Sequence, residues 1–229
     1  MNTVDNFTSS VTAAVQSRRS IRAFLQRPVD GAALREVLKQ AAQAPSGGNL
    51  QPWRIVVLGG EQLAAFKAKI ADRLAASALP DPEEYFIYPP KLGEPYRTRR
   101  FRCGEMPYAL VGIAREQKAE RLKWFANNYG FFGAPVGLFC YVERSMGYAQ
   151  WSDLGMYLQT VMLLLRERGL DSCAQECWSV YHSTVDAFVE PPANHMLFCG
   201  MSIGFEDVTI DYPRTGRAPL GETLTFIDG

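Results

Sequence analysis

One segment of this sequence predicts a helix that is apolar on nearly every side. Residues 151–168 carry apolar side chains that fit no single helix face, namely Leu154, Met156, Tyr157, Leu158, Val161, Met162, Leu163, Leu164 and Leu165. A helix that is apolar all round has to be covered all round. In a chain of 229 residues, such a helix is either a central core helix or part of a subunit interface. We favour the interface.

Helices and strands are interspersed along the rest of the chain. Apolar residues at helical spacing predict helices at residues 8–16, from the N-cap Asp30 to the stop at Pro45, at residues 61–77 and from about Ser183. Short apolar runs predict strands at residues 53–58, 135–142 and 196–203, with a short extended piece at 224–227. No repeat or linker interrupts the chain, so we expect one α+β or α/β sandwich domain over residues 1–229.

The overall charge excludes several classes of partner. The chain has 24 basic and 24 acidic residues and a pI near 6.7, which argues against binding to nucleic acid or to an anionic membrane. It has no apolar run of the roughly 18 residues that a membrane span needs. Residues 1–10 lack the basic start and apolar core of a secretory signal. We therefore expect a cytoplasmic protein.

Cysteine and histidine are too sparse for metal or nucleophilic chemistry. Cys173 and Cys177 lie near His182, but no second pair completes a tetrahedral zinc site. His182 and His195 are the only two histidines, and we expect neither to be a catalyst. We predict no bound metal and no catalytic side chain. If the protein is an enzyme, a cofactor carries its chemistry.

A basic cluster lies at residues 17–22, where Arg18, Arg19 and Arg22 place three guanidinium groups within five positions. Such a cluster repels itself unless an anion lies in it, and guanidinium suits phosphate and polarised carbonyl groups. A second polar turn follows at residues 44–53. The two together indicate a site for a phosphorylated, ring-bearing cofactor. The alternative is a solvated helix end followed by an ordinary loop.

Residues 79–106 differ in character from the rest of the chain. They contain five prolines and a basic run at residues 97–102. A long proline-rich segment in a compact chain is typical of a lid or a binding loop. We predict a lid or an excursion from the domain, and a mobile surface segment is the alternative. The sequence leaves open whether these arginines contact a cofactor phosphate or an acidic substrate.

Four short motifs occur in a defined order. They are Arg-Arg-Ser-x-Arg at 18–22, Pro-Ser-Gly-Gly-Asn at 45–49, Gly-Leu-Asp-Ser at 169–172 and Arg-x-x-Arg-x-Pro at 214–219. Neither a Rossmann nor a P-loop motif is present. In this order and at these separations, the motifs resemble the nitroreductase family of FMN-dependent oxidoreductases. The resemblance covers residues 17 to about 226.

The resemblance implies a fold and an assembly. The fold is α+β, a nitroreductase-like sandwich in which helices flank a central, mainly antiparallel sheet. The assembly is an interlocked homodimer with two FMN sites at the subunit interface, each built from both chains. Residues 205–229 would form a C-terminal extension that packs on the partner subunit.

The same resemblance assigns roles to residues. Arg18, with Arg19 beside it, would face the FMN phosphate, and Ser20 belongs to the same segment. Arg22 matches the basic residue near the N1 and O2 edge of the flavin ring. The loop that reaches the flavin from the partner subunit is matched by Pro45, Ser46, Gly47 and Asn49. The stretch against one ring face near N5 is matched by Ala174, Gln175 and Glu176. The late basic loop at the phosphate is matched by Arg214 and Arg217. Cys177 stands where many relatives have glycine.

The implied activity is that of an NAD(P)H-dependent reductase. A nicotinamide would pass hydride to flavin N5 and leave, and a nitroaromatic or related electron-poor acceptor would then take its place, in a ping-pong mechanism. Trp124, Phe131 and Phe132 either line this pocket or belong to the core. The alternatives are a reductive dehalogenase or another non-nitro reductase of the same fold, or a flavin-binding protein without turnover. The sequence does not choose between NADH and NADPH.

One prediction concerns Arg22. Reduced flavin tends to lose its N1 proton, so a cation near N1 and O2 favours the reduced form. A charge pair about 4 Å apart at an effective dielectric constant of about 20 gives about 4 kcal/mol, or at most about 90 mV for a two-electron couple. We expect Arg22→Leu to lower the midpoint potential of the bound flavin by up to this amount in a redox titration. An unchanged midpoint would exclude the role.

Overall fold

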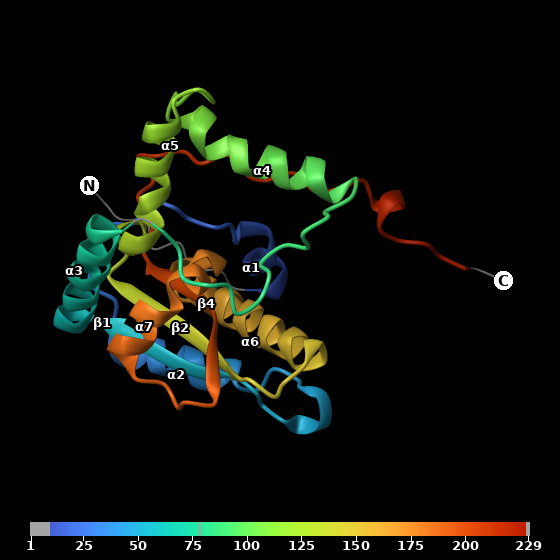
Figure 1. The fold of residues 1–229 in the computed structure, drawn as a ribbon. Helices are drawn as coiled ribbons and strands as arrows, with labels where there is room; N and C mark the ends of the chain where they lie inside the picture. Colours follow the sequence, from blue (N-terminus) through green and yellow to red (C-terminus); the bar gives the residue numbers. More distant parts are fainter. Residues whose placement is uncertain (1–9, 78, 228–229) are drawn as a thin grey trace.

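The fold is organised around a four-stranded antiparallel sheet (Figure 1). The computed structural model describes residues 10–77 and 79–227. The strands lie in the order β1-β2-β4-β3 and comprise β1 (Arg54–Gly59), β2 (Val136–Glu143), β3 (Asp171–Gln175) and β4 (His195–Gly204). The strands predicted at residues 53–58, 135–142 and 196–203 are confirmed as β1, β2 and β4. β3 was not predicted, because its sequence has no run of branched or aromatic residues.

Helices surround this sheet. They are α1 (Val11–Ser17), α2 (Gly31–Ala41), α3 (Gly60–Ala76), α4 (Tyr96–Leu110), α5 (Lys118–Phe125), α6 (Tyr148–Glu167) and α7 (His182–Val189), with short 3-10 helices η1 (Gly47–Asn49), η2 (Ala126–Gly133), η3 (Glu176–Tyr181) and η4 (Leu220–Glu222). The predicted helices are confirmed as α1, α2, α3, α6 and α7, although the predicted start of the first, residues 8 and 9, lies outside the described residues. Asp30 caps α2 as expected, since its side chain accepts a hydrogen bond of 2.9 Å from the Ala32 N–H. The α+β fold with a mainly antiparallel sheet is therefore confirmed.

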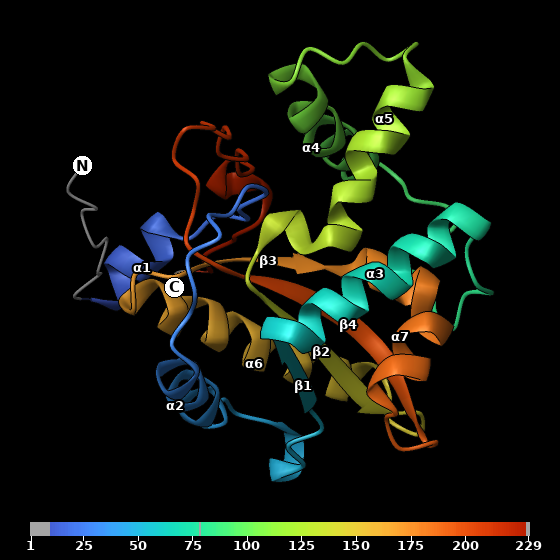
Figure 2. The same ribbon diagram turned by 90° about the vertical axis from the view of Figure 1, so that its left-hand side faces the viewer.

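The core has one cluster on each face of the sheet. Along β2, Leu138 and Cys140 pack toward α2 and α6, whereas Phe139 and Tyr141 pack toward α3 and α7. Figure 2 shows the sheet between these two layers. Every residue of β2 except its last, Glu143, is buried. Burial on both faces explains why its sequence is continuously apolar rather than alternating.

The long apolar helix α6 covers one face of the sheet but is not covered all round by its own chain. Leu154, Val161 and Leu165 are fully buried against the sheet and α2. A strip on the opposite side of the helix is exposed and includes Gly155, Met156 and Gln159. Met156 keeps 38% of its surface accessible. The core of this chain therefore covers one side of α6, and the subunit interface stays a prediction for the exposed strip.

The segment at residues 79–106 has two parts. Its first part is fixed to the body, because the Asp81 carboxylate accepts hydrogen bonds from the backbone N–H and the hydroxyl of Ser183, and the Tyr85 hydroxyl donates to the Phe198 carbonyl. Its second part enters α4, which has no apolar stripe and contains Pro107. For this reason helix periodicity did not predict α4. Together with α5, α4 stands apart from the sandwich, and the C-terminal segment runs beside it (Figure 1).

Candidate functional site

The basic cluster at residues 18–22 runs along the free edge of β3. α1 ends at Ser17, and the chain becomes extended at Arg18. Ser20 then forms a parallel bridge with Ser172, and the Ile21 N–H donates to the Ser172 carbonyl at 3.1 Å. The Ile21 side chain is fully buried and anchors the segment in the core. The first and third sequence motifs are thereby brought side by side within one chain.

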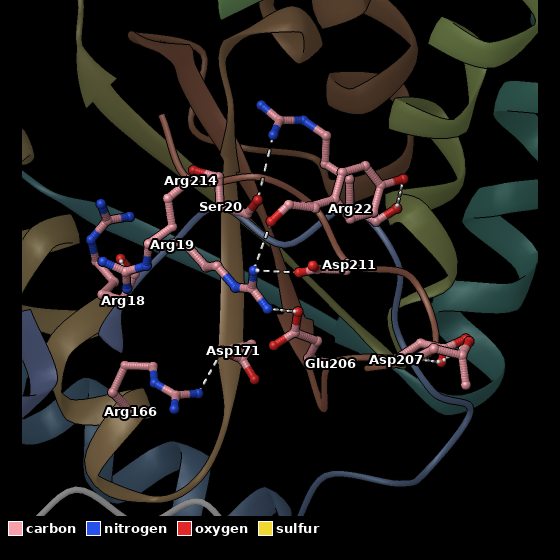
Figure 3. A network of polar contacts seen from close by, with 12 residues as sticks. Arg18, Arg19, Ser20, Arg22, Arg166, Asp171, Glu206, Asp207, Asp211 and Arg214 are labelled. Carbon is pink, nitrogen blue, oxygen red and sulfur yellow. Dashed lines mark hydrogen bonds and ion pairs between the residues drawn. The ribbon is translucent and has the colours of Figure 1, made fainter. Parts of the chain in front are cut away.

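Arg19 joins this segment to the chain that follows β4. Its Nη2 lies 2.5 Å from Glu206 Oε1, and its Nη1 donates to the Tyr212 carbonyl at 2.7 Å (Figure 3). The Asp211 carboxylate is a second acidic partner, with its Oδ1 at 3.8 Å from Arg19 Nη1. The charge of Arg19 is therefore already balanced inside the protein. Arg19 lines the cavity described below, but it is held by Glu206 rather than directed outward as a free cation.

A second ion pair supports the same region from beneath. Arg166, in the last turn of α6, pairs with Asp171 at the start of β3 over 2.5 Å, and both side chains are buried (Figure 3). Arg166 Nε also donates to the Ser17 hydroxyl at 3.3 Å, so the same guanidinium fixes the end of α1. Burial raises the pKa of Asp171, although Arg166 acts in the opposite direction. Burial likewise raises the pKa of Glu206 against the effect of Arg19.

Four further guanidinium groups line one cavity of about 160 Å³. The cavity is lined by Arg18, Arg19, Ser20, Arg22, Cys103, Tyr212, Pro213, Arg214, Thr215 and Arg217. Among the residues that the structure describes, Arg18, Arg22, Arg214 and Arg217 have no carboxylate partner. Burial lowers the pKa of Arg18, and repulsion from Arg217 and Arg214 lowers it further. Unbalanced cations gathered on one cavity suit a multiply charged anion.

The remaining contacts of these arginines are to uncharged groups. Arg214 Nη2 lies 3.5 Å from the Arg18 carbonyl, and Arg217 Nη1 lies 2.9 Å from both the carbonyl and the hydroxyl of Thr215. Arg22 Nη1 lies 3.4 Å from the Ser20 carbonyl. None of these contacts neutralises a charge, so the cations remain available to an anion.

The stretch predicted to face the flavin ring, residues 174–176, lies at the end of β3 and has both exposed and buried side chains. Ala174 and Glu176 are exposed, whereas the side chain of Gln175 is buried. Gln175 Nε2 donates to the Asn128 carbonyl at 2.7 Å, and its Oε1 accepts from the Ser202 hydroxyl at 2.7 Å. The side chain of Gln175 is therefore committed to the protein and is not available to a ligand.

Cys177 fits this backbone without strain. It lies in η3, and it is absent from the described non-glycine residues that have positive φ. Burial raises the pKa of its thiol. Glycine is therefore not required at this position by the backbone conformation of this chain.

The predicted loop at residues 45–49 lies far from the arginines. The Gly47 N–H donates to both carboxylate oxygens of Asp153, in the second turn of α6, at 3.2 and 3.3 Å. Arg166, which contacts Ser17 beside the basic cluster, is in the last turn of the same helix. At 1.5 Å per residue, these two turns of α6 are about 20 Å apart. Pro45, Ser46, Gly47 and Asn49 are thus not part of the arginine-lined cavity of their own chain.

The three aromatic candidates lie in or against the core. Phe131 is fully buried, Phe132 is 6% exposed, and both belong to the cluster around Phe66 and Trp178. Trp124 packs against Tyr108 and Phe132, with ring centroids 5.3 and 6.4 Å apart. Of the two readings that the sequence left open, the geometry of Phe131 and Phe132 agrees with the core.

Several residues of this region carry no signal in the sequence. Glu206 is an isolated acidic residue, and the Gly-Leu-Asp-Ser motif contains Asp171 without indicating a partner for it. Only the tertiary contacts pair these two residues with Arg19 and Arg166. Tyr212 contributes both a carbonyl to Arg19 and a cavity wall. Cys103 reaches the cavity from α4, which was not predicted as a helix. Only its position directly after the basic run at residues 97–102 could have drawn attention to it.

Within residues 10–77 and 79–227, no helix is long and apolar enough to cross a membrane. In the same part of the chain, no group of three or more His, Cys, Asp or Glu side chains is placed to hold a metal ion.

The sheet and its helical layers define an α+β protein with an arginine-lined cavity at the free edge of β3. Residues 15–205 match the sequence profile of the nitroreductase family, and this chain belongs to that family. It is 36% identical over 200 residues to a 4-nitrobenzoate reductase of Pseudomonas putida, covering 87% of each chain. It is 34% identical over 217 residues to a nitrobenzene nitroreductase of Ectopseudomonas oleovorans, covering 93% of this chain and 95% of the relative.

Solved structures give the same result. The fold matches that of the FMN and NADPH-dependent nitroreductase NfnB from Sphigopyxis sp. strain HMH, with a TM-score of 0.91, 45% identity, and coverage of 96% of this chain and 100% of the other. It also matches the FMN-dependent nitroreductase NfnB from Mycobacterium smegmatis in complex with NADPH, with a TM-score of 0.89, 29% identity, and coverage of 95% and 97%.

A prediction follows for the pair of Arg19 and Glu206. Arg19→Met leaves the Glu206 carboxylate without this cation, and the pKa of Glu206 in the folded state then rises further. A carboxyl whose folded-state pKa is raised loses stability as the pH climbs from its unfolded pKa toward the folded one. We expect the free energy of unfolding to fall by about 1–3 kcal/mol at about pH 7.5 and by clearly less at about pH 5.

Urea unfolding at the two pH values measures both losses. The double variant Arg19→Met/Glu206→Gln is the matched control, because it removes the carboxylate that Arg19→Met leaves unbalanced, and it should recover most of the loss at the higher pH. Equal losses at both pH values, with no recovery in the double variant, would contradict a charge-balancing role for Arg19.

Proposed function

We propose that this protein is an FMN-dependent oxidoreductase that takes reducing equivalents from NAD(P)H and passes them to nitroaromatic or related electron-poor acceptors. The observation that carries the proposal is the convergence of Arg18, Arg214 and Arg217, without carboxylate partners among the described residues, on one cavity. Membership of the nitroreductase family and the named activities of its relatives support it.

The donor set fits the phosphate of FMN. A phosphate monoester is close to doubly charged at neutral pH and offers three acceptor oxygens. Guanidinium groups bind such oxygens in pairs through parallel N–H donors. Arg18, Arg214 and Arg217 would hold the phosphate, and the loss of their mutual repulsion would favour binding. Arg19 takes no direct part in this account, because Glu206 already balances its charge.

The other residues predicted to bind the cofactor would hold its flavin ring. Bound FMN supplies the redox chemistry, and NAD(P)H and the acceptor use the site in turn. The exposed Ala174 and Glu176, at the end of β3, would offer backbone to one ring face. Arg22, which lines the same cavity, would lie at the N1 and O2 edge. His182 and His195 do not line the arginine-lined cavity, so we assign them no part in proton transfer.

We further propose that two copies of this single-domain chain build each site. The loop at residues 45–49 and the arginines of one chain stand at opposite ends of α6. A two-fold axis perpendicular to the exposed strip of α6 would run two such helices antiparallel and bring the loop of one chain to the arginines of the other. This arrangement would also cover Gly155, Met156 and Gln159.

The C-terminal extension would be shared between the two chains. Residues 206–212 pack on the basic cluster of their own chain through Arg19. Beyond them, Leu220, Phe226 and Ile227 expose 67%, 73% and 96% of their surface. We propose that this last part packs on the partner subunit. The need for a nicotinamide donor supports a cytoplasmic location.

The activity is tested by the colour of the purified protein. We expect a yellow protein that NADH or NADPH bleaches under anaerobic conditions, because the flavin is reduced, and that 4-nitrobenzoate restores to yellow. Absorbance of the flavin band follows both steps. A colourless protein without FMN affinity would refute the proposal. A yellow protein that neither nucleotide bleaches would instead be a flavin-binding protein without turnover, and one recoloured only by a haloarene or quinone would be another reductase.

The shared site is tested by complementation between two inactive variants. Arg18→Gln removes a phosphate contact, and Gly47→Trp places bulk on the exposed loop. In a mixed dimer, one site carries both changes and the other carries neither. We therefore expect coexpression of equal amounts to restore about a quarter of wild-type activity.

Differently tagged chains allow the mixed dimer to be isolated and assayed alone, with each pure variant as its control. Sites contained within one chain would leave the mixed dimer as inactive as its parents, and this result would refute the two-chain arrangement.

A further inference from the structure

A second and larger cavity adjoins the arginine-lined one. It has a volume of about 600 Å³ and lies between one side of α4 and the C-terminal segment that runs beside it (Figure 1). Its walls are Pro95, Thr98, Arg99, Arg102, Cys103, Met106, Thr215, Gly216, Arg217, Ala218, Pro219, Glu222 and Thr223. A volume of this size falls within the usual range of small-molecule sites.

The walls of this cavity combine basic and apolar side chains. Arg99, Arg102 and Arg217 supply three cations, and Glu222 is the one acidic residue among the lining residues. Glu222 Oε2 lies 2.7 Å from Arg99 Nη2, in a pair whose two side chains are 50% and 39% exposed. An exposed pair of this kind is weak. Arg102 has no ion-pair partner among the described residues, so the cavity keeps a net positive charge.

The two cavities are continuous through shared walls. Cys103, Thr215 and Arg217 line both of them. A molecule in the larger cavity would therefore lie directly beside the phosphate site proposed for FMN, with Arg217 between the two. The apolar side chains of Pro95, Met106 and Pro219 offer flat contact surface next to the arginines.

We propose that the larger cavity binds the 2′-phosphorylated adenosine of NADPH and that Arg102 and Arg99 thereby select NADPH over NADH. The proposal rests on the function proposed above and adds the choice of electron donor. The 2′-phosphate is the only group by which the two donors differ, and it is a phosphate monoester, the ligand that guanidinium binds best. The apolar walls suit the adenine ring.

An alternative ligand is the carboxylate of an acidic nitroarene. A monocarboxylate carries one charge and is satisfied by a single bidentate guanidinium. Besides Arg217, which is assigned to the FMN phosphate, the present cavity offers Arg99 and Arg102, and its volume is far larger than a single substituted ring requires. These features favour the nucleotide, and the experiment below separates the two ligands.

The experiment uses the full-length protein loaded with FMN. We expect Arg102→Gln to raise the KM for NADPH roughly tenfold, as for a lost charged hydrogen bond, and to change the KM for NADH much less. Glu222→Gln should have the opposite effect, lowering the KM for NADPH about two- to fivefold, because it releases Arg99. Arg97→Gln is the matched control, since Arg97 is on the same helix, outside both cavities, and pairs with Glu94 at 2.8 Å.

Direct binding provides a second readout that does not depend on turnover. Isothermal titration with 2′,5′-ADP should show binding to the wild type that Arg102→Gln weakens and Arg97→Gln does not, whereas AMP should bind weakly to all three. An unchanged ratio of kcat/KM for NADPH and NADH in Arg102→Gln would overturn the proposal. So would a rise in the KM for 4-nitrobenzoate alone. In both cases the FMN content and the NADH activity would show that the reductase function itself stands.

Discussion

The constraint on which this site depends is the mutual repulsion of guanidinium groups that the fold brings together. Arg18, Arg214 and Arg217 come from both ends of the chain and face one cavity without a counter-charge among the described residues. Such an arrangement persists only if neighbouring contacts hold the two segments in place. Arg19 does so through Glu206 and the Tyr212 carbonyl, and the bridge between Ser20 and Ser172 fixes the first segment to the sheet.

The adjacent arginines of the basic cluster thus have different tasks. The charge of Arg18 is available to a bound anion. Arg19 instead donates its hydrogen bonds to the Tyr212 carbonyl and the Glu206 carboxylate. Beneath them, the buried pair of Arg166 and Asp171 connects the end of α6, the end of α1 and the start of β3. Burial raises the pKa values of Asp171 and Glu206, and each carboxylate is paired with an arginine. The charges beneath the cavity are therefore paired, whereas the arginines that line the cavity keep a net positive charge.

Much of the fold was predictable because its elements obey simple local patterns. β1, β2 and β4 are apolar runs, and α2, α3 and α6 carry apolar residues at helical spacing. β3 and α4 were missed for a common reason, which is that their sequences are atypical. β3 lacks the branched and aromatic residues typical of strands, and α4 lacks the apolar stripe typical of helices. β3 is a strand because β4 and Ser20 pair with it. α4 packs by one side against the C-terminal segment, where Arg99 pairs with Glu222.

The sequence by itself determined the family, the residue types that suit a phosphorylated cofactor and most of the secondary structure, because these depend on composition and on local spacing. Only the tertiary structure decided which cations remain free, where Phe131 and Phe132 lie, and that the loop at residues 45–49 is separated from the arginines by the length of α6. It also joined α4 to the site through a second cavity. The physical reason is that charge balance and burial are set by contacts between residues far apart in the chain, as between Arg19 and Glu206, and no local pattern records such contacts.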